Sequence, residues 1–246
     1  MGGASRSEKR RKQEEAEQRL AAAGIRVPQK RNRTPTIVVS VVLVLAVVIG
    51  GAVLLARGLG GSVEPTYTAS AEGAVVTAGT GPVVIDVYED YICPSCERFE
   101  ERYGDDITTA LNEGRLTVRF HTIAILDEQS EPAGYSTRAA NAALCAVPAG
   151  IFPLFHEKLF EEQPAEGSAG LTDEQLIQFG TELGAQGDFA ACVRGGSHAD
   201  AVATETAAAT KNPDLQTEGR FGTPTVAIDG KKINLNDTSW LQEALG

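Results

Sequence analysis

The sequence predicts an α/β fold, built around a strand–helix–strand unit and preceded by one N-terminal transmembrane helix. An apolar run over residues 82–88 stands shortly before the stretch Cys-Pro-Ser-Cys, and a helical pattern follows that stretch. The pattern is again helical from about 131 to 211 and returns to strands near the C-terminus. Separately, a run of twenty uncharged residues lies close to the N-terminus.

The uncharged run, residues 37–56, is long enough to cross a membrane as a helix. At about 1.5 Å per residue it spans the roughly 30 Å of bilayer hydrocarbon. Several Lys and Arg residues precede the run and only Arg57 follows it closely, so we expect a cytoplasmic N-terminus and an extracytoplasmic body. A cleaved signal peptide is the alternative, but the leader and the run are longer than usual, and no clean A-x-A site follows. We therefore expect a single-pass protein of the cell membrane.

Charge is distributed unevenly along the 246 residues, whose net charge is -11. Residues 1–36 carry ten Lys or Arg and four Glu, about +6 by count, so the remainder carries -17. An acidic body argues against nucleic acid as a partner. The expected organisation is a basic cytoplasmic tail (1–36), with a charged helix or disordered segment over 5–23, then the anchor (37–56), a linker (57–71) and one globular domain (72–246).

The globular domain begins with strand patterns. Residues 74–77 predict a first strand, and the almost continuous apolar character of 83–88 is typical of a buried central strand. Residues 116–120 alternate between apolar and polar side chains, which indicates a half-buried strand. Between these two strands a helix is predicted from the Cys-Pro-Ser-Cys stretch to a stop at 112–114, because apolar residues recur on one face: Phe99, Tyr103, Ile107 and Leu111. Strand, helix and strand in this order imply parallel pairing.

A helical block fills about 131–211, and a closing strand–strand–helix pattern follows it. Thr172, with Gln175 three residues later, forms an N-cap signal that opens one of these helices. The expected helices are 136–147, 153–160, 172–184, one from 188, and 198–210; the expected closing elements are strands 225–228 and 232–235, a turn at 229–230, and a helix over 238–245.

Cys93 and Cys96 lie at the junction between the central strand and the helix that follows it. Pro94 suits the first helical position, where its missing N–H costs nothing. A thiol at Cys93 would lie at the positive end of the helix dipole, next to unpaired backbone N–H groups that stabilise a thiolate. This position between a strand and a helix favours a redox-active pair of cysteines. The alternative is that the two cysteines form half of a zinc site.

The remaining two cysteines lie in the helical block. Four cysteines on the exported side of a membrane permit disulfides, and an even count allows three pairings. If Cys93 and Cys96 pair locally, Cys145 is left with Cys192, 47 residues further along the chain. We expect this disulfide to be structural. A second redox pair is the alternative, although neither cysteine belongs to a C-x-x-C motif or to a helix start.

Two stretches carry a resemblance to a known family: residues 88–96 (YEDYICPSC) and residues 221–230 (FGTPTVAIDG). In this order and spacing they resemble the DsbA-like thiol–disulfide oxidoreductases, specifically the membrane-anchored forms of Gram-positive bacteria. The resemblance covers about residues 72–246 and implies a thioredoxin fold with a helical insertion. It also implies an enzyme that introduces disulfides into reduced exported proteins, uses no cofactor, and is reoxidised by a quinone-linked membrane protein.

The same resemblance implies roles for individual residues. Cys93 would be the exposed nucleophile and Cys96 its buried partner, while Pro94 and Ser95 between them tune the redox potential. Pro224 matches the family's cis-proline beside the redox pair. The backbone of the preceding residue, Thr223, would hydrogen-bond a bound substrate segment by strand addition.

Two positions depart from the family pattern. Strongly oxidising members carry His where this chain has Ser95, so we expect a weaker oxidant with a less extreme pKa at the nucleophilic thiol. Many thioredoxin-fold enzymes place a buried carboxylate six residues before the first cysteine, where this chain has Val87. Asp86 should point to the other face of the strand, and Glu89 and Asp90 are expected to be solvated loop charges.

Two other functions are weighed against a disulfide oxidase. A reductase or isomerase would use the same pair differently, although isomerases of this kind usually carry a dimerisation domain. A metal- or protein-binding module would use Cys93 and Cys96 as ligands, but two thiolates without a nearby His make a poor four-ligand site. The three histidines, His121, His156 and His198, form no ligand pattern, so we expect ordinary surface or core residues and no metal site.

Overall fold

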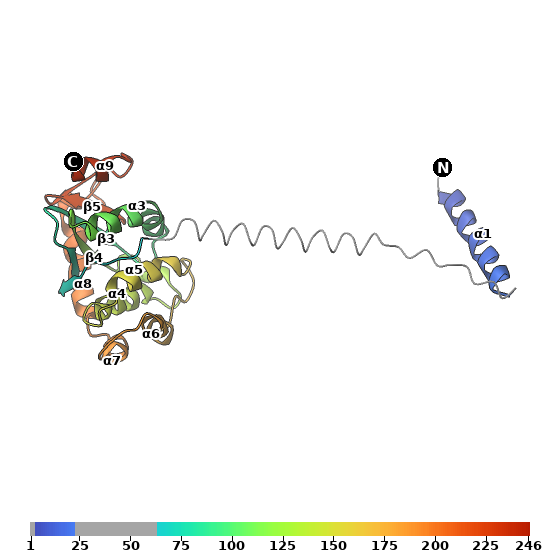
Figure 1. Cartoon of the computed structure of the whole chain (residues 1–246), viewed down its shortest axis with the longest axis horizontal. Helices are drawn as coiled ribbons and strands as arrows, with labels where there is room; N and C mark the ends of the chain where they lie inside the picture. The colour runs from blue at the N-terminus through green and yellow to red at the C-terminus, as the bar shows by residue number, and fades with distance from the viewer. Residues whose placement is uncertain (1–2, 23–62) are drawn as a thin grey trace. The chain divides into compact units, whose positions relative to one another are not determined.

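The computed structural model describes residues 3–22 and 63–246, which belong to two compact units divided between residues 61 and 62 (Figure 1). The described part of the first unit is the helix α1 (Gly3–Ala22), with exposed ion pairs between residues four apart. This segment was predicted to be either a charged helix or disordered, and its described residues form the charged helix. The predicted anchor, residues 37–56, lies outside the described residues. Within the described ranges, no helix combines the length and the hydropathy that a membrane crossing requires.

A mixed six-stranded sheet lies at the centre of the second unit, in the spatial order β1–β2–β4–β3–β5–β6. β3 and β4 run parallel and are joined by α3 (Pro94–Asn112), whereas the other neighbouring pairs in this sheet are antiparallel. The strands are β1 (Ala69–Glu72), β2 (Val75–Gly79), β3 (Val83–Glu89), β4 (Leu116–Thr122), β5 (Thr225–Ile228) and β6 (Lys231–Lys232). The predicted strand–helix–strand unit with a parallel pair is confirmed.

The two edge strands differ from the sequence prediction. β1 was not predicted, because its residues are small or polar, largely exposed, and show no apolar alternation. Its pairing with β2 is what makes it a strand. β6 contains only Lys231 and Lys232, although the Ile233 N–H still donates to the Val226 carbonyl at 2.9 Å. Short and charged edge strands of this kind discourage pairing with other chains.

The block between β4 and β5 is helical, as predicted. Its helices are α4 (Tyr135–Ala146), α5 (Phe152–Glu161), α6 (Asp173–Glu182), α7 (Phe189–Gly195) and α8 (Ala199–Lys211), with 3₁₀ turns at Asp127–Gln129 and Pro213–Leu215, and α9 (Trp240–Leu245) follows β6. The predicted capping box is formed: the Thr172 hydroxyl accepts the Gln175 N–H at 3.2 Å, and the Gln175 side chain accepts the Thr172 N–H at 2.9 Å. This order of elements is the expected thioredoxin fold with a helical insertion.

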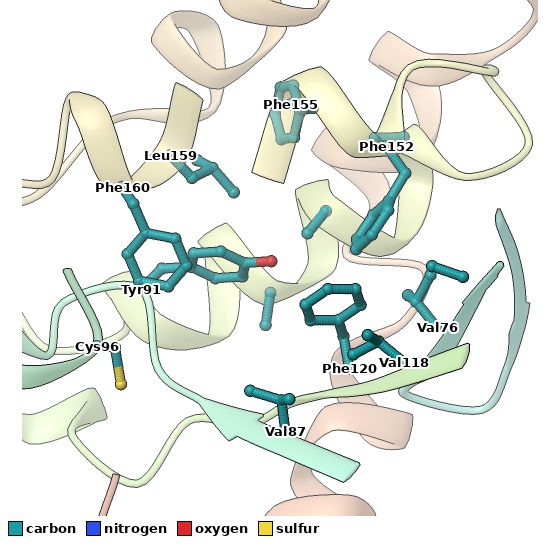
Figure 2. Close-up of a cluster of buried hydrophobic side chains, with 14 of the residues drawn as sticks. Val76, Val87, Tyr91, Cys96, Val118, Phe120, Phe152, Phe155, Leu159 and Phe160 are labelled. Atoms are coloured by element: carbon teal, nitrogen blue, oxygen red, sulfur yellow. The ribbon is translucent and has the colours of Figure 1, made fainter. Parts of the chain in front are cut away.

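Alternating side chains of β4 separate the two faces of the sheet. Leu116, Val118 and Phe120 are buried on the face that packs against α3 and α5, whereas Arg119 and His121 lie on the other face. Figure 2 shows the apolar core on the first face, with Cys96 at its margin and Tyr91 between sheet and helix; the sheet contributes Val76, Val87, Val118 and Phe120, and α5 contributes Phe152, Phe155, Leu159 and Phe160. The redox pair thus borders the main core.

The opposite face carries a polar network beside α8, centred on the buried Asp86. The Asp86 carboxylate accepts from Arg119 at 2.6 Å and lies 2.9 Å from Nε2 of His121, whose Nδ1 is 2.7 Å from Glu205 of α8. Burial opposes ionisation of Asp86, but the bonds from His121 and Arg119 lower its pKa below the usual value. Asp86 therefore points away from the redox pair, as strand alternation predicted.

Residues 63–68, which the sequence assigned to the linker, lie along α3. The Val63 N–H donates to the Asp105 carboxylate at 2.9 Å, and the Thr66 N–H donates to the Asn112 side chain at 2.7 Å. The Asn112 amide in turn donates to the Glu64 carbonyl at 2.9 Å. These bonds fix the chain against α3 before β1 begins.

Candidate active site

The loop between β3 and α3 is held by Asp90, which is fully buried. Its carboxylate accepts from the backbone N–H groups of Ile92 and Leu126, at 3.1 and 2.9 Å, and from the Ser136 hydroxyl at 2.6 Å. Burial raises the pKa of Asp90 to about 6, although these hydrogen bonds oppose the shift. The prediction that Asp90 is a solvated charge is wrong, because the carboxylate ties the loop that carries Cys93 to the helical insertion.

Cys93 is the N-cap residue of α3, and Pro94 is the first residue of the helix. In the dithiol form described here, a hydrogen bond from the Cys96 thiol lowers the pKa of Cys93 to about 6. Burial opposes this shift, whereas hydrogen bonds from the Thr223 side chain and from the backbone N–H groups of Cys96 and Ser95 reinforce it. The start of α3 therefore stabilises a thiolate at Cys93, as its place in the sequence predicts.

Cys96 has the opposite electrostatic environment. It is completely buried in the first turn of α3. Burial, the hydrogen bond to Cys93 and the negative charge of Glu89 all raise its pKa well above the usual value. One thiol of the pair therefore favours the thiolate and the other holds its proton.

Cys93 is not exposed, contrary to what the family resemblance implied. Only 5% of its surface is accessible. Its thiol donates to the Thr223 carbonyl at 3.5 Å, and the Gln163 side chain, which follows α5, donates to the Cys93 carbonyl at 3.2 Å. A substrate must displace part of this cover to reach the sulfur.

The residues predicted to tune the redox potential, Pro94 and Ser95, and those predicted to bind substrate, Thr223 and Pro224, lie around the Cys93 sulfur. Pro94 and Ser95 are half-buried, and the Ser95 hydroxyl accepts from the Arg98 guanidinium at 2.8 Å. No cation was predicted beside Ser95 from the sequence. Arg98 follows Ser95 by three residues on the same helix, and this spacing could have indicated the contact. The Thr223–Pro224 peptide bond is cis. The Thr223 carbonyl at this bond accepts the hydrogen bond from the Cys93 thiol.

A second group of polar side chains, which was not predicted from the sequence, lies near the buried Cys96. Glu89 is 3% exposed, so the prediction of a solvated loop charge is wrong for it as well. It lies with Glu100 of α3 and His156 of α5, whose ligand atoms are all within 4.8 Å of one another. Burial and the charge of Glu100 raise the pKa of Glu89 well above its usual value. Glu89 lies on the same face of β3 as the buried Val87, so strand alternation could have predicted that Glu89 is buried.

Cys145 and Cys192 are joined by a disulfide that links α4 to α7, with the Cα atoms 5.9 Å apart. Cys145 is buried within α4, and neither cysteine lies at the start of its helix. This is the expected pairing, and its position fits a structural crosslink.

Comparisons with known proteins agree with this geometry. Residues 72–245 match the family model described as Thioredoxin. Among solved structures, the reduced disulfide bond oxidoreductase DsbG of Mycobacterium tuberculosis is 30% identical with a TM-score of 0.58, over 66% of this chain and 76% of that chain. Oxidised DsbA of the same species is 28% identical with a TM-score of 0.58, over 73% of this chain and 93% of that chain. The thiol–disulfide oxidoreductase MdbA of Corynebacterium diphtheriae, 23% identical, shares the fold with a TM-score of 0.64, over 76% of this chain and 98% of that chain.

A sequence relative is the serine/threonine-protein kinase PknE of Mycobacterium tuberculosis, 33% identical over 181 residues. The alignment covers 71% of this chain but 32% of PknE. The chain thus spans about a third of the length of the curated relatives that it matches.

Proposed function

Because the chain belongs to the thioredoxin family, and within it to the DsbA-like thiol–disulfide oxidoreductases, we propose that its Cys93–Cys96 pair introduces disulfides into reduced exported proteins. The observation that carries this proposal is the opposite shift of the two thiol pKa values at the start of α3. A stabilised Cys93 thiolate favours the reduced enzyme, which is the requirement for an oxidant of other proteins.

The reaction follows from this asymmetry. A substrate thiolate attacks Sγ of Cys93 in the enzyme disulfide, so a mixed disulfide forms and Cys96 leaves and takes up a proton. A second substrate thiolate then attacks the substrate sulfur of the mixed disulfide and expels the Cys93 thiolate. Two electrons pass from the substrate to the enzyme pair, one proton stays on Cys96, and the other is released to solvent.

The backbone around Thr223 is the proposed substrate-binding edge. Its carbonyl lies 3.5 Å from the Cys93 sulfur, which places a backbone acceptor directly beside the reacting atom. An extended substrate segment that pairs with Thr223 and Pro224 would carry its cysteine to Cys93 and displace the thiol–carbonyl hydrogen bond.

Two assays distinguish the oxidase from the other functions. The oxidised chain should reactivate reduced, denatured ribonuclease faster than it reactivates ribonuclease with scrambled disulfides, and it should be slow to reduce insulin. Faster recovery of the scrambled protein would indicate an isomerase, and efficient insulin reduction would indicate a reductase. A metal assay of the purified chain tests the remaining alternative, in which Cys93 and Cys96 hold a metal ion.

The proposed location is the cell membrane, with residues 1–36 cytoplasmic and residues 37–56 as a single anchor. A quinone-linked membrane protein would then reoxidise the pair. Membrane fractionation of a chain tagged at its N-terminus tests the anchor; recovery of a soluble form that has lost the tag would contradict it.

Ser95→His should raise the reduction potential of the Cys93–Cys96 couple by roughly 30 mV, or about 1.4 kcal/mol, because an imidazolium beside the start of α3 stabilises the thiolate further. Equilibration with glutathione redox buffers measures the potential. Ser95→Ala is the matched control, since it removes the hydroxyl that accepts from Arg98 without adding a cation. An unchanged or lower potential in Ser95→His would refute this account of the tuning.

A further inference from the structure

Three side chains with metal-binding atoms converge from three separate elements. Glu89 ends β3, Glu100 belongs to α3 and His156 belongs to α5. Nε2 of His156 lies 3.7 Å from Oε2 of Glu89 and 3.7 Å from Oε1 of Glu100. The fold thus brings together a nitrogen and two carboxylate oxygens that are far apart in the sequence.

These atoms are buried with few hydrogen-bond partners. Nε2 of His156 has none, and the carboxyl groups of Glu89 and Glu100 have none except one another. Glu89 and His156 are at least nine-tenths buried. A separation of 3.7 Å is too long for a hydrogen bond. Two ligands bound to one Zn²⁺ at about 2.0–2.2 Å in a tetrahedral arrangement lie about 3.3–3.6 Å apart, so a small inward shift of each side chain would suffice.

The imidazole is already oriented for such a role. Its Nδ1 lies 2.8 Å from the hydroxyl of Tyr91, which is buried, and this contact turns Nε2 toward the two carboxylates. Ligand histidines commonly hold their second nitrogen in this way, because the outer hydrogen bond fixes the tautomer and the ring plane.

An acidic cavity of about 290 Å³ between α3 and α5 leads to the cluster. Glu100 and His156 both line it, and the described lining residues include no Lys or Arg. Its carboxylates are Glu97, Glu100, Glu101, Asp105, Glu157 and Glu161. Such a lining attracts cations and leaves room for a water molecule as a further ligand.

We propose that Glu89, Glu100 and His156 form a binding site for a first-row divalent cation, for which Zn²⁺ is the appropriate probe. One imidazole with two carboxylates suits Zn²⁺, whereas Ca²⁺ takes six to eight oxygen ligands. The bound ion would neutralise the buried carboxylate of Glu89 and the partly buried carboxylate of Glu100, and it would connect β3, α3 and α5 beside the redox pair. The site does not depend on the thiols or on the function proposed for them.

Calorimetric titration of the full chain with Zn²⁺, in mild detergent and after chelator treatment, tests this site. The chain is kept oxidised, so that Cys93, Cys96, Cys145 and Cys192 are all in disulfides and offer no thiolate. One Zn²⁺ should bind per chain, and Glu100→Gln and His156→Ala should each weaken binding at least about tenfold. Glu101→Gln is the matched control, because Glu101 is an exposed carboxylate of the same cavity outside the cluster; its affinity should change less than about twofold.

Thermal unfolding gives a second readout. Zn²⁺ should raise the Tm of the wild type and of Glu101→Gln, but not that of Glu100→Gln or His156→Ala, with circular dichroism to show that each variant is folded. If the folded wild type binds no Zn²⁺, the two carboxyl groups share a proton instead and the proposal is overturned. Equal binding by the wild type and by both cluster variants would also overturn it.

Discussion

Cys93→Ala is expected to lower the rate of disulfide transfer to reduced ribonuclease by roughly 10³-fold or more, to the level without enzyme. The reason is that every step of the reaction forms or breaks a bond to Sγ of Cys93, and the raised pKa of the buried Cys96 makes it a poor substitute. Ribonuclease reactivation measures the loss.

Cys96→Ser is the informative partner of this variant. Its Cys93 thiolate can still attack a disulfide, but the buried hydroxyl at position 96 cannot resolve the product. The variant should therefore accumulate mixed disulfides on Cys93, visible as adducts on a non-reducing gel. Adducts on Cys96 in Cys93→Ala, or normal turnover by either variant, would show that the roles of the two thiols are wrongly assigned.

Replacing both Cys145 and Cys192 with alanine is expected to reduce the free energy of unfolding by about 4 kcal/mol, if the crosslink acts mainly on the entropy of the unfolded chain. The disulfide spans 47 residues and joins α4 to α7. Denaturant unfolding of the oxidised protein measures the change, with Cys93→Ala/Cys96→Ala as the control that keeps this crosslink. Unfolding of both double variants at the wild-type denaturant concentration would contradict a structural role.

The same substitution should leave the redox chemistry largely intact below the unfolding transition. Cys145 and Cys192 are bonded to each other, and neither is among the groups that set the pKa of Cys93. A large fall in ribonuclease reactivation by folded Cys145→Ala/Cys192→Ala would instead favour the second redox pair that the sequence left open.

The sequence was most informative where a local pattern decides the structure. The near-continuous apolar run of β3, the helix-face spacing of α3 and the Thr172 capping box each depend on neighbouring residues, and each is found as predicted. The start of α3 at Pro94 follows from the same local chemistry. β1 was missed because a polar edge strand is defined only by its partner β2.

The polar groups near the redox pair were harder to predict, because tertiary contacts decide their environment. The sequence predicts a loop charge at Asp90, but Ser136 of the insertion and Leu126, which precedes the insertion, donate hydrogen bonds to its carboxylate. The sequence predicts a solvated Glu89, but in the folded protein Glu89 packs against Glu100 of α3 and His156 of α5. No local pattern connects residues that far apart in the chain.

The burial of Cys93 has a similar origin. The resemblance implied an exposed nucleophile, but Cys93 is buried and is contacted by Thr223 and Gln163, which come from distant segments of the chain. Their contacts matter for function, because the Thr223 side chain is among the groups that lower the pKa of Cys93.

The most direct test of the whole account is a pH titration of the reduced chain, followed by the ultraviolet absorbance of the Cys93 thiolate, with Cys93→Ala as the blank. The pKa of Cys93 is lowered in the folded state, so the thiolate should stabilise the reduced form fully above the ordinary thiol pKa. This stabilisation should be lost as the pH falls through about 6. A midpoint near pH 6 is the expected result. A midpoint near about 8.5, the value of a free cysteine, would contradict the claim that the start of α3 activates this sulfur.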